Sequence, residues 1–252
     1  MDRITSHSEL LRLARGDPWI RWGLPAELVG PVWSDGTIAL IQRPGVRPGF
    51  WVAPLRGPAP ENGVRAALRW LAAEELMERT GGEVISVPQG CSGLAAELFD
   101  LGEGGDWEWM WTTTLPEVEP REDELVELDD LGDAAEISAF SRANNPRLWT
   151  EVGTGLVRWL GLRDAAGELV AVGGSLVEES GVDYLSGIVT ARHRRGAGLA
   201  SVVSGALTRR AVAADGVCTL AIFSDNDTAR RVYQRLGYQT ARAWSSRWLR
   251  TR

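Results

Sequence analysis

The chain has 252 residues and a formal net charge of −7; 44% of its residues are hydrophobic and 24% are charged. This is the composition of a globular protein, which excludes a disordered chain, and the acidity argues against nucleic-acid binding. No apolar run approaches the ~20 residues of a membrane helix, and the charged N-terminus and the two cysteines predict a cytoplasmic protein.

The first half of the sequence alternates predicted strands with predicted helices. We expect strands over residues 37–45, 49–55, 82–90 and 106–115, and helices over residues 61–80 and 92–103. In the last of these strands Trp107, Trp109 and Trp111 alternate and therefore share one face. We interpret these rings as core or as an inter-domain seam; the alternative is an aromatic wall of a substrate pocket.

A carboxylate-rich segment, residues 115–130, separates the two halves. It contains two prolines and no helical apolar stripe, which indicates a solvated linker. We therefore predict an N-terminal domain over residues 1–120 and a C-terminal domain over residues 121–252.

The second half has the predicted order helix, helix, strand, strand, helix, strand, helix, strand. The ranges are 130–143, about 147–160, 167–179, 182–190, 201–214, 217–224, 226–238 and 239–249. This order is typical of an α/β layered domain. The first half repeats part of it, so we predict an internal duplication. Its first copy is degenerate, because Pro58 and Pro60 stand where the second copy has glycines.

Residues 190–200 form a basic, glycine-punctuated loop between a predicted strand and a predicted helix. Gly196, Gly198 and Ala200 let the backbone approach a ligand closely, and the helix directs unpaired N–H groups and its positive end toward the loop. Such a loop suits a pyrophosphate, although it lacks the Lys-Ser/Thr pair of a nucleotide P-loop. An ordinary strand-to-helix turn with solvated arginines is the alternative.

A second motif occupies residues 226–238. Asn226 is placed to cap a helix, Ala229 and Tyr233 fall on one helical face, and Gly237 ends the helix. Taken alone, this segment is a capped amphipathic helix with a core tyrosine.

Together, the two segments resemble the GNAT superfamily of acetyl-CoA-dependent N-acetyltransferases. The signature Gln/Arg-x-x-Gly-x-Gly/Ala is matched by Arg195, Gly198 and Ala200. The later motif Asn-x-x-Ala-x-x-x-Tyr-x-x-x-Gly-Phe/Tyr is matched by Asn226, Ala229, Tyr233, Gly237 and Tyr238. Residues 187–190 and 218–225 are similar to the glycine N-acyltransferase-like branch of the superfamily.

The resemblance covers roughly residues 125–252 and implies the GNAT fold. This is an α/β (α+β) architecture with a central mixed, mostly antiparallel sheet flanked by helices. The first half fits a plan of two tandem copies in which the C-terminal copy is intact and the N-terminal copy is degenerate.

The resemblance also implies roles for individual residues. Backbone groups of Ile188, Val189 and Thr190 pair with the pantetheine arm, and Asn226 bonds to its amide region. Tyr233 protonates the departing coenzyme A thiolate. The remaining cofactor contacts are expected from Ala229 and from the loop whose N–H groups bind the pyrophosphate: Arg195, Gly196, Ala197, Gly198, Leu199 and Ala200.

An amine nucleophile must lose a proton, which requires a base or a water chain. Asp183 is the preferred candidate, because its place at the start of strand 182–190 is similar to that of a catalytic Glu in several family members. Glu178, Glu179 and Ser186 are weaker candidates, and water alone is a further alternative.

The predicted function is transfer of an acetyl group from acetyl-CoA to a primary amine of a small molecule or amino acid, directly within a ternary complex. Two alternatives stay open: an acyltransferase with another acyl donor, and a non-catalytic acyl-CoA-binding regulatory module. No Cys/His cluster predicts a metal site. We expect no nucleic-acid or membrane partner, and a homodimer is left open.

Overall fold

The computed structural model describes residues 1–43, 45 and 47–250. The chain folds into two compact units: unit 1 comprises Met1–Trp109, Ile222–Asp225 and residues 240–250, and unit 2 comprises Met110–Ala221 and Asn226–Gln239. Residues 240–250 cluster with unit 1 because their strand pairs with a strand of that unit. Pro44, within the predicted strand 37–45, lies outside the described residues.

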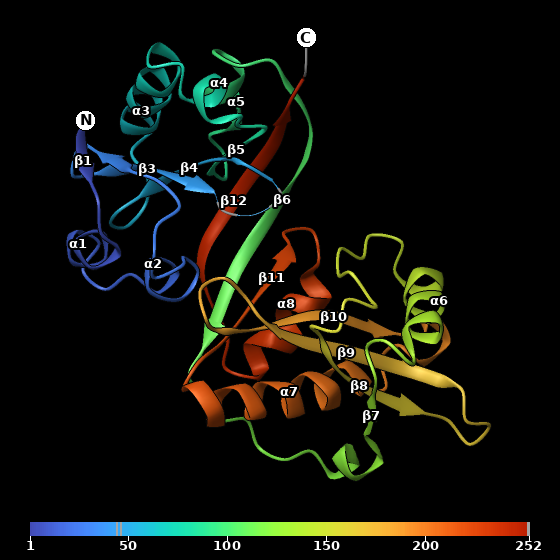
Figure 1. Cartoon of the computed structure of the whole chain (residues 1–252). Coiled ribbons are helices and arrows are strands. Elements are labelled where there is room, and N and C mark those ends of the chain that lie inside the picture. The colour runs from blue at the N-terminus through green and yellow to red at the C-terminus, as the bar shows by residue number, and fades with distance from the viewer. Residues whose placement is uncertain (44, 46, 251–252) are drawn as a thin grey trace. The chain divides into compact units, whose positions relative to one another are not determined.

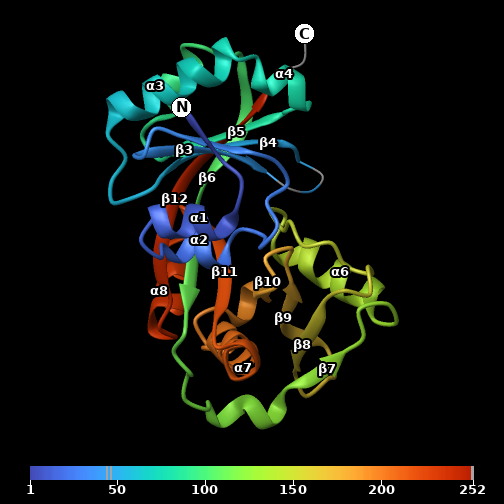
Figure 2. The same cartoon turned by 60° about the vertical axis from the view of Figure 1, so that its left-hand side comes forward.

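Unit 1 is a sheet with helices on both faces (Figures 1 and 2). In spatial order its strands are β1 (Asp2–Ile4), β2 (Val32–Ser34), β3 (Ile38–Arg43), β4 (Gly49–Pro54), β5 (Val84–Pro88), β12 (Gln239–Leu249) and β6 (Leu101–Thr112). Its helices are α1 (His7–Leu13), α2 (Pro18–Trp22), α3 (Glu61–Ala73), α4 (Leu76–Thr80) and α5 (Ser92–Ala96). Helices α3, α4 and α5 cover one face, and α1 and α2 lie on the other.

The helix predicted over residues 61–80 is broken into α3 and α4. Glu75 adopts a left-handed conformation with φ of 51°, which stops α3 and starts α4. The turn directs Leu76 and Met77 into the core under α3, where they are 3% and 1% exposed. Burial of these two side chains therefore offsets a backbone conformation that a straight helix would avoid.

The helix predicted over residues 92–103 is mostly wrong. Only α5 forms, and the chain then enters β6 at Leu101, five residues earlier than the predicted strand. Phe99 and Leu101 pack against the core formed by α3 and the sheet, so tertiary packing overrides the helical pattern. The structure also contains β1, α1, α2 and β2, for which the sequence analysis made no prediction.

Unit 2 also consists of strands between helices. In spatial order its strands are β11 (Cys218–Phe223), β10 (Asp183–Thr190), β9 (Leu169–Val177), β8 (Arg158–Arg163) and β7 (Val126–Leu128). Its helices are α6 (Ala134–Asn144), α7 (Leu199–Asp215) and α8 (Asp227–Arg235), with short 3-10 turns η1 (Pro120–Glu124) and η2 (Arg192–Arg194). No helix in the described parts of the chain is long and apolar enough to cross a membrane.

Helices α6 and α7 cover opposite faces of the unit 2 sheet. A Cβ on Gly173 would meet Val203 and Leu207 of α7, whereas one on the next residue, Gly174, would meet Trp159. Trp159 packs in the same core cluster as Ile137 of α6. Since successive strand residues point to opposite faces, the two helices lie on opposite sides.

The helix predicted over about 147–160 is wrong, because these residues form an irregular loop followed by β8. Gly153 and Gly155 have φ of 87° and 75°, which a helix cannot accommodate. The predicted linker 115–130 also contains η1 and β7.

One buried carboxylate, Asp130, holds this loop. It accepts hydrogen bonds from the N–H groups of Gly153 at 3.0 Å and Gly155 at 2.7 Å, and from Trp159 Nε1 at 2.8 Å. Burial alone would raise the pKa of Asp130, but hydrogen bonds from Gly153, Trp159, Val157 and Gly155 outweigh it and lower the pKa to about 2.

A β-bulge interrupts β10 where it pairs with β9. The register shifts between Ser186 and Val189, and Gly187 takes a left-handed φ of 69°. A Cβ at Gly187 would lie 2.5 Å from the Trp159 ring. Two features therefore require glycine at position 187: the left-handed backbone conformation and the close approach of the Trp159 ring.

We expect Asp130→Asn to lower the free energy of unfolding at pH 7 by about 2 kcal/mol, because the native pKa lies nearly two units below that of a free carboxyl group. A carboxyl group whose pKa is lowered by folding stabilises the folded state at any pH above its pKa in the unfolded chain. This contribution is lost as the pH falls toward the folded-state pKa of about 2. Urea unfolding at pH 7 and pH 3 measures it. If the difference in unfolding free energy between the wild type and Asp130→Asn were as large at pH 3 as at pH 7, the stabilising role of the ionised Asp130 would be contradicted.

We expect Gly187→Ala to destabilise the protein by at least about 3 kcal/mol, because a clash adds to the backbone strain. The matched control is Gly181→Ala in the β9–β10 turn, where φ is 77° but a Cβ meets nothing within 4 Å. Only strain of about 1 kcal/mol applies there. Urea unfolding measures the loss of unfolding free energy in both variants. Equal losses in Gly187→Ala and Gly181→Ala would show that the contact with Trp159 is unimportant.

Candidate functional site

Strands β10 and β11 pair at one end only. The parallel register joins Tyr184 to Thr219 and Leu185 to Leu220, and no further pair follows among the described residues. On its other edge β10 stays paired with β9 as far as Thr190. The edge of β10 beyond Leu185 therefore has peptide groups without a strand partner, which an extended amide chain can pair with. The predicted residues Ile188, Val189 and Thr190 lie on this open segment.

The loop after β10 presents unpaired backbone donors. Gly196 and Gly198 have φ of 83° and 77°, and a Cβ on either would meet nothing within 4 Å. Gly198 is the N-cap of α7 and supplies no side-chain cap. Along the described chain, no protein acceptor takes a hydrogen bond from the N–H groups of residues 196–200. Aligned donors at the positive end of a 17-residue helix suit a diphosphate.

Asn144, at the end of α6, fixes the start of this loop. Its Oδ1 accepts from the Arg192 N–H at 3.0 Å, and its carbonyl accepts from Arg195 Nη2 at 2.8 Å. The sequence analysis did not assign Asn144 a functional role. Its position before Asn145-Pro146 marks only a helix end, so no local signal reveals the contact.

Tyr233 lies on α8 and is 7% exposed. Its ring packs edge-on against Tyr238 at 5.6 Å, and Tyr238 Oη bonds to Thr208 Oγ1 at 2.9 Å. Burial raises the pKa of the Tyr233 phenol, and nearby Ser204 lowers it by less. The phenol is therefore protonated at neutral pH and is a proton donor.

Asn226 caps α8, as its sequence pattern predicts. Its Oδ1 accepts from the Ala229 N–H at 3.1 Å, so this oxygen is used within the protein. The cap fixes the N-terminus of the helix that carries Tyr233.

The two candidate bases differ in environment. Asp183 is 2% exposed and forms an ion pair with Arg158, whose side chain is 61% exposed. Glu178 is half-buried at the end of the β9–β10 hairpin, and burial together with Glu179 raises its pKa to about 7. Burial raises the pKa of the half-buried Tyr184 phenol, and Glu178 and, to a smaller extent, Tyr233 raise it further.

Ser186, another predicted candidate, is engaged within the protein. Its Oγ lies 2.6 Å from Thr150 Oγ1, which joins the irregular loop before β8 to the bulge of β10. Among the residues that the structure describes, no three His, Cys, Asp or Glu side chains gather into a group that could hold a metal ion.

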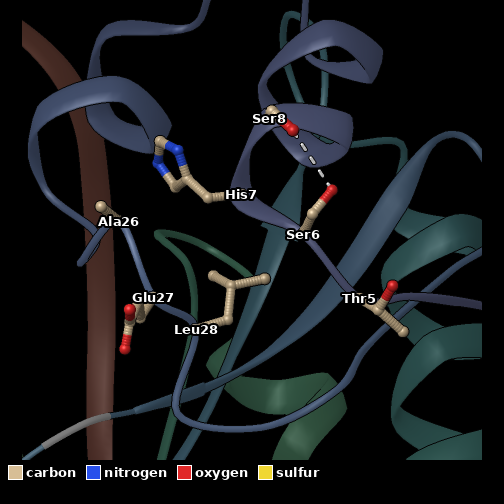
Figure 3. Close-up of a pocket in the computed structure, with 7 residues that line it drawn as sticks. All are labelled: Thr5, Ser6, His7, Ser8, Ala26, Glu27 and Leu28. Carbon is tan, nitrogen blue, oxygen red and sulfur yellow. Dashed lines mark hydrogen bonds between the residues drawn. The ribbon is translucent and has the colours of Figure 1, made fainter.

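A separate pocket of about 430 Å³ lies in unit 1 at the start of α1 (Figure 3). It is lined by Thr5, Ser6, His7, Ser8, Ala26, Glu27 and Leu28. His7 Nε2 lies 2.6 Å from the Ile20 carbonyl oxygen, so the ring is held by the backbone. None of the predicted site residues lines this pocket; all of them belong to unit 2.

Comparisons with known proteins found a family model and solved structures that are similar to this chain. Residues 159–249 match the family model described as FR47-like protein, and no curated protein sequence is significantly similar. A putative acetyltransferase from the GNAT family of Novosphingobium aromaticivorans is 19% identical, with 96% of each chain covered and a TM-score of 0.54.

Two further solved structures are similar. A GCN5-related N-acetyltransferase from Kribbella flavida is 16% identical, with 88% of this chain and 90% of that chain covered and a TM-score of 0.51. An acetyltransferase from the GNAT family of Colwellia psychrerythraea is 13% identical, with 99% of each chain covered and a TM-score of 0.54. The predicted fold class is confirmed: the chain has the mixed sheet flanked by helices that is the fold of these GNAT acetyltransferases.

Proposed function

We propose that the protein transfers an acetyl group from acetyl-CoA to a primary amine of a small molecule or amino acid. The observation that carries this proposal is the open edge of β10 ending in a loop of unpaired N–H groups. The pantetheine amides pair with Ile188–Thr190 as an added strand, and the diphosphate accepts from the N–H groups of residues 195–200.

Bound in this way, the thioester lies beside the bulge of β10. A backbone N–H of the Ile188–Val189 segment polarises its carbonyl, and the amine attacks directly without a covalent enzyme intermediate. When the tetrahedral intermediate collapses, the carbon–sulfur bond breaks and Tyr233 gives its proton to the departing thiolate. Burial of Tyr233 supports this role, because it keeps the phenol protonated until the thiolate forms.

We propose Glu178 in place of Asp183 as the base that takes a proton from the amine. The Asp183 carboxylate is buried and already paired with Arg158, which restrains it. Glu178 is half-buried and beside Tyr184, and its raised pKa matches a base that works near neutral pH.

We further propose that the N-terminal domain, residues 1–120, is a degenerate copy of the C-terminal domain, residues 121–252. In unit 1, β4 and β5 pair in parallel over Gly49–Trp51 and are connected through α3, as β10 and β11 are through α7. The N-cap of α3 is Pro60, which has no N–H to offer an anion. The preference for a small-molecule amine follows the resemblance of residues 187–190 and 218–225 to the glycine N-acyltransferase-like branch.

We expect Tyr233→Phe to lower kcat by about 10- to 1,000-fold and to leave acetyl-CoA affinity nearly unchanged, because only the proton donor is lost. The matched control is Tyr238→Phe, which removes the neighbouring hydroxyl that bonds to Thr208. Thiol release with a panel of amines measures turnover, and calorimetry measures affinity. Equal activity of Tyr233→Phe and wild type would remove Tyr233 from the mechanism.

We expect the rate of the wild-type enzyme to fall as the pH drops below about 7, because protonated Glu178 cannot accept a proton. Glu178→Gln should lower kcat/KM by about 100-fold and abolish this acidic limb. Asp183→Asn should keep the limb. The pH profile of kcat/KM for the three proteins decides: a limb that persists in Glu178→Gln and disappears in Asp183→Asn would restore Asp183 as the base.

A further inference from the structure

A second pocket of about 430 Å³ lies in unit 1. Its volume is within the range of about 300–1,000 Å³ that small-molecule sites occupy. The lining residues all belong to unit 1, whereas the residues proposed for acyl transfer belong to unit 2. We refer to this space as the arginine–indole pocket. Its walls come from β1, β2, β3, α3 and α4, and its lining includes Arg3, Trp33, Gln42, Trp70, Glu74 and Arg79.

Two indole rings give the arginine–indole pocket a flat apolar surface. Trp33 and Trp70 are half-buried, and their ring centroids lie 5.7 Å apart with the ring planes at 49°. Both rings pack against the core cluster under α3, which also contains the lining residue Leu76. The core therefore holds the two rings in place, and the parts of the rings that it leaves uncovered line the pocket. Such a surface suits another aromatic ring.

The strand register places a cation beside this surface. Arg3 of β1 lies directly opposite Trp33 of β2, and Trp33 lies opposite Leu40 of β3. Residues that are directly opposite each other point to the same face of a sheet, and Leu40 is buried in the core cluster under α3. Arg3 is therefore on the side of the sheet that α3 covers, where its exposed side chain lines the pocket.

Helix α4 contributes a second cation. The left-handed turn at Glu75 separates α4 from α3, and Arg79 after the turn lines the same pocket as Trp70 before it. Arg79 Nη1 donates to the Glu74 carbonyl oxygen at 3.2 Å. Among the residues that the structure describes, no carboxylate pairs with Arg79 or with Arg3. Two guanidinium groups without a counter-ion therefore line one space.

The charges around the pocket favour a ligand with one negative charge. Arg3 and Arg79 contribute two positive charges, and the exposed side chain of Glu74 contributes one negative charge, which leaves one positive charge in excess. A single carboxylate balances this excess. The second negative charge of a phosphate ester would have no counter-charge and would be repelled by Glu74.

We propose that the arginine–indole pocket binds a small aromatic carboxylate. The ring of the ligand lies on Trp33 and Trp70, and its carboxylate accepts hydrogen bonds from Arg3 and Arg79. The half-buried amide of Gln42 lines the same space and supplies a neutral donor. This inference rests on unit 1 alone and does not depend on the acyltransferase function.

The test is an NMR titration of the full-length protein, labelled with 15N in its tryptophan side chains, with 2-naphthoate. The indole N–H signals of Trp33 and Trp70, assigned through Trp33→Phe and Trp70→Phe, should shift and saturate. The signal of Trp159, which belongs to unit 2, should stay in place. 2-Naphthamide, which has the same ring without the charge, should bind at least about 5-fold more weakly. 2-Naphthyl phosphate, which carries a second negative charge, should also bind more weakly than 2-naphthoate.

Charge variants test the two cations directly. Arg3→Gln and Arg79→Gln should each weaken the binding of 2-naphthoate by about 3- to 10-fold, because each removes one exposed charged partner. Glu74→Gln should strengthen binding by about 2- to 5-fold, because it removes a like charge. The matched control is Arg69→Gln, which removes an exposed positive charge of α3 that does not line the pocket and should bind as the wild type does.

Four results would each overturn the proposal. They are absence of saturation at millimolar 2-naphthoate, equal affinity for 2-naphthamide, tighter binding of 2-naphthyl phosphate, and losses of affinity in Arg3→Gln and Arg79→Gln no larger than the loss in Arg69→Gln. All four changed side chains are exposed, so the variants should fold as the wild type does, which urea unfolding verifies.

Discussion

The parting of β10 from β11 after Leu185 is the constraint on which the rest of unit 2 depends. A paired strand would satisfy its own peptide groups and leave nothing for a ligand. Here the bulge at Gly187 turns the chain where pairing stops, and Trp159 fills the space that any other side chain would need. The open edge then leads directly into the unpaired N–H groups before α7. Backbone, more than side chains, thus provides the proposed cofactor contacts.

Two polar anchors hold the loops around this edge. Asp130 accepts hydrogen bonds from N–H groups of the segment before β8. Asn144 accepts hydrogen bonds from the Arg192 N–H and from the Arg195 side chain at the start of the 192–198 loop. Both act from outside the segments that they fix. Because the loops are already ordered, binding does not have to supply that ordering free energy. The same logic applies to α8, whose Asn226 cap fixes the first turn of the helix that carries Tyr233.

Sequence predicts best the features that depend on local chemistry. Gly196 and Gly198 adopt the left-handed conformation that glycine favours, and Asn226 caps α8 as its sequence pattern predicts. The helix predicted near 147–160 fails because Asp130, more than twenty residues earlier, binds Gly153 and Gly155. The restraint on Asp183 comes from Arg158 on a strand that was predicted as helix.

The most direct test of the central claim follows the backbone amide signals of Gly196, Ala197 and Gly198 by NMR while acetyl-CoA is added. If these N–H groups bind a diphosphate, their signals shift together and saturate at one molecule of acetyl-CoA per chain. Pantetheine, which lacks the nucleotide, should leave the chemical shifts of these signals unchanged. Signals that stay in place at millimolar acetyl-CoA would contradict the account.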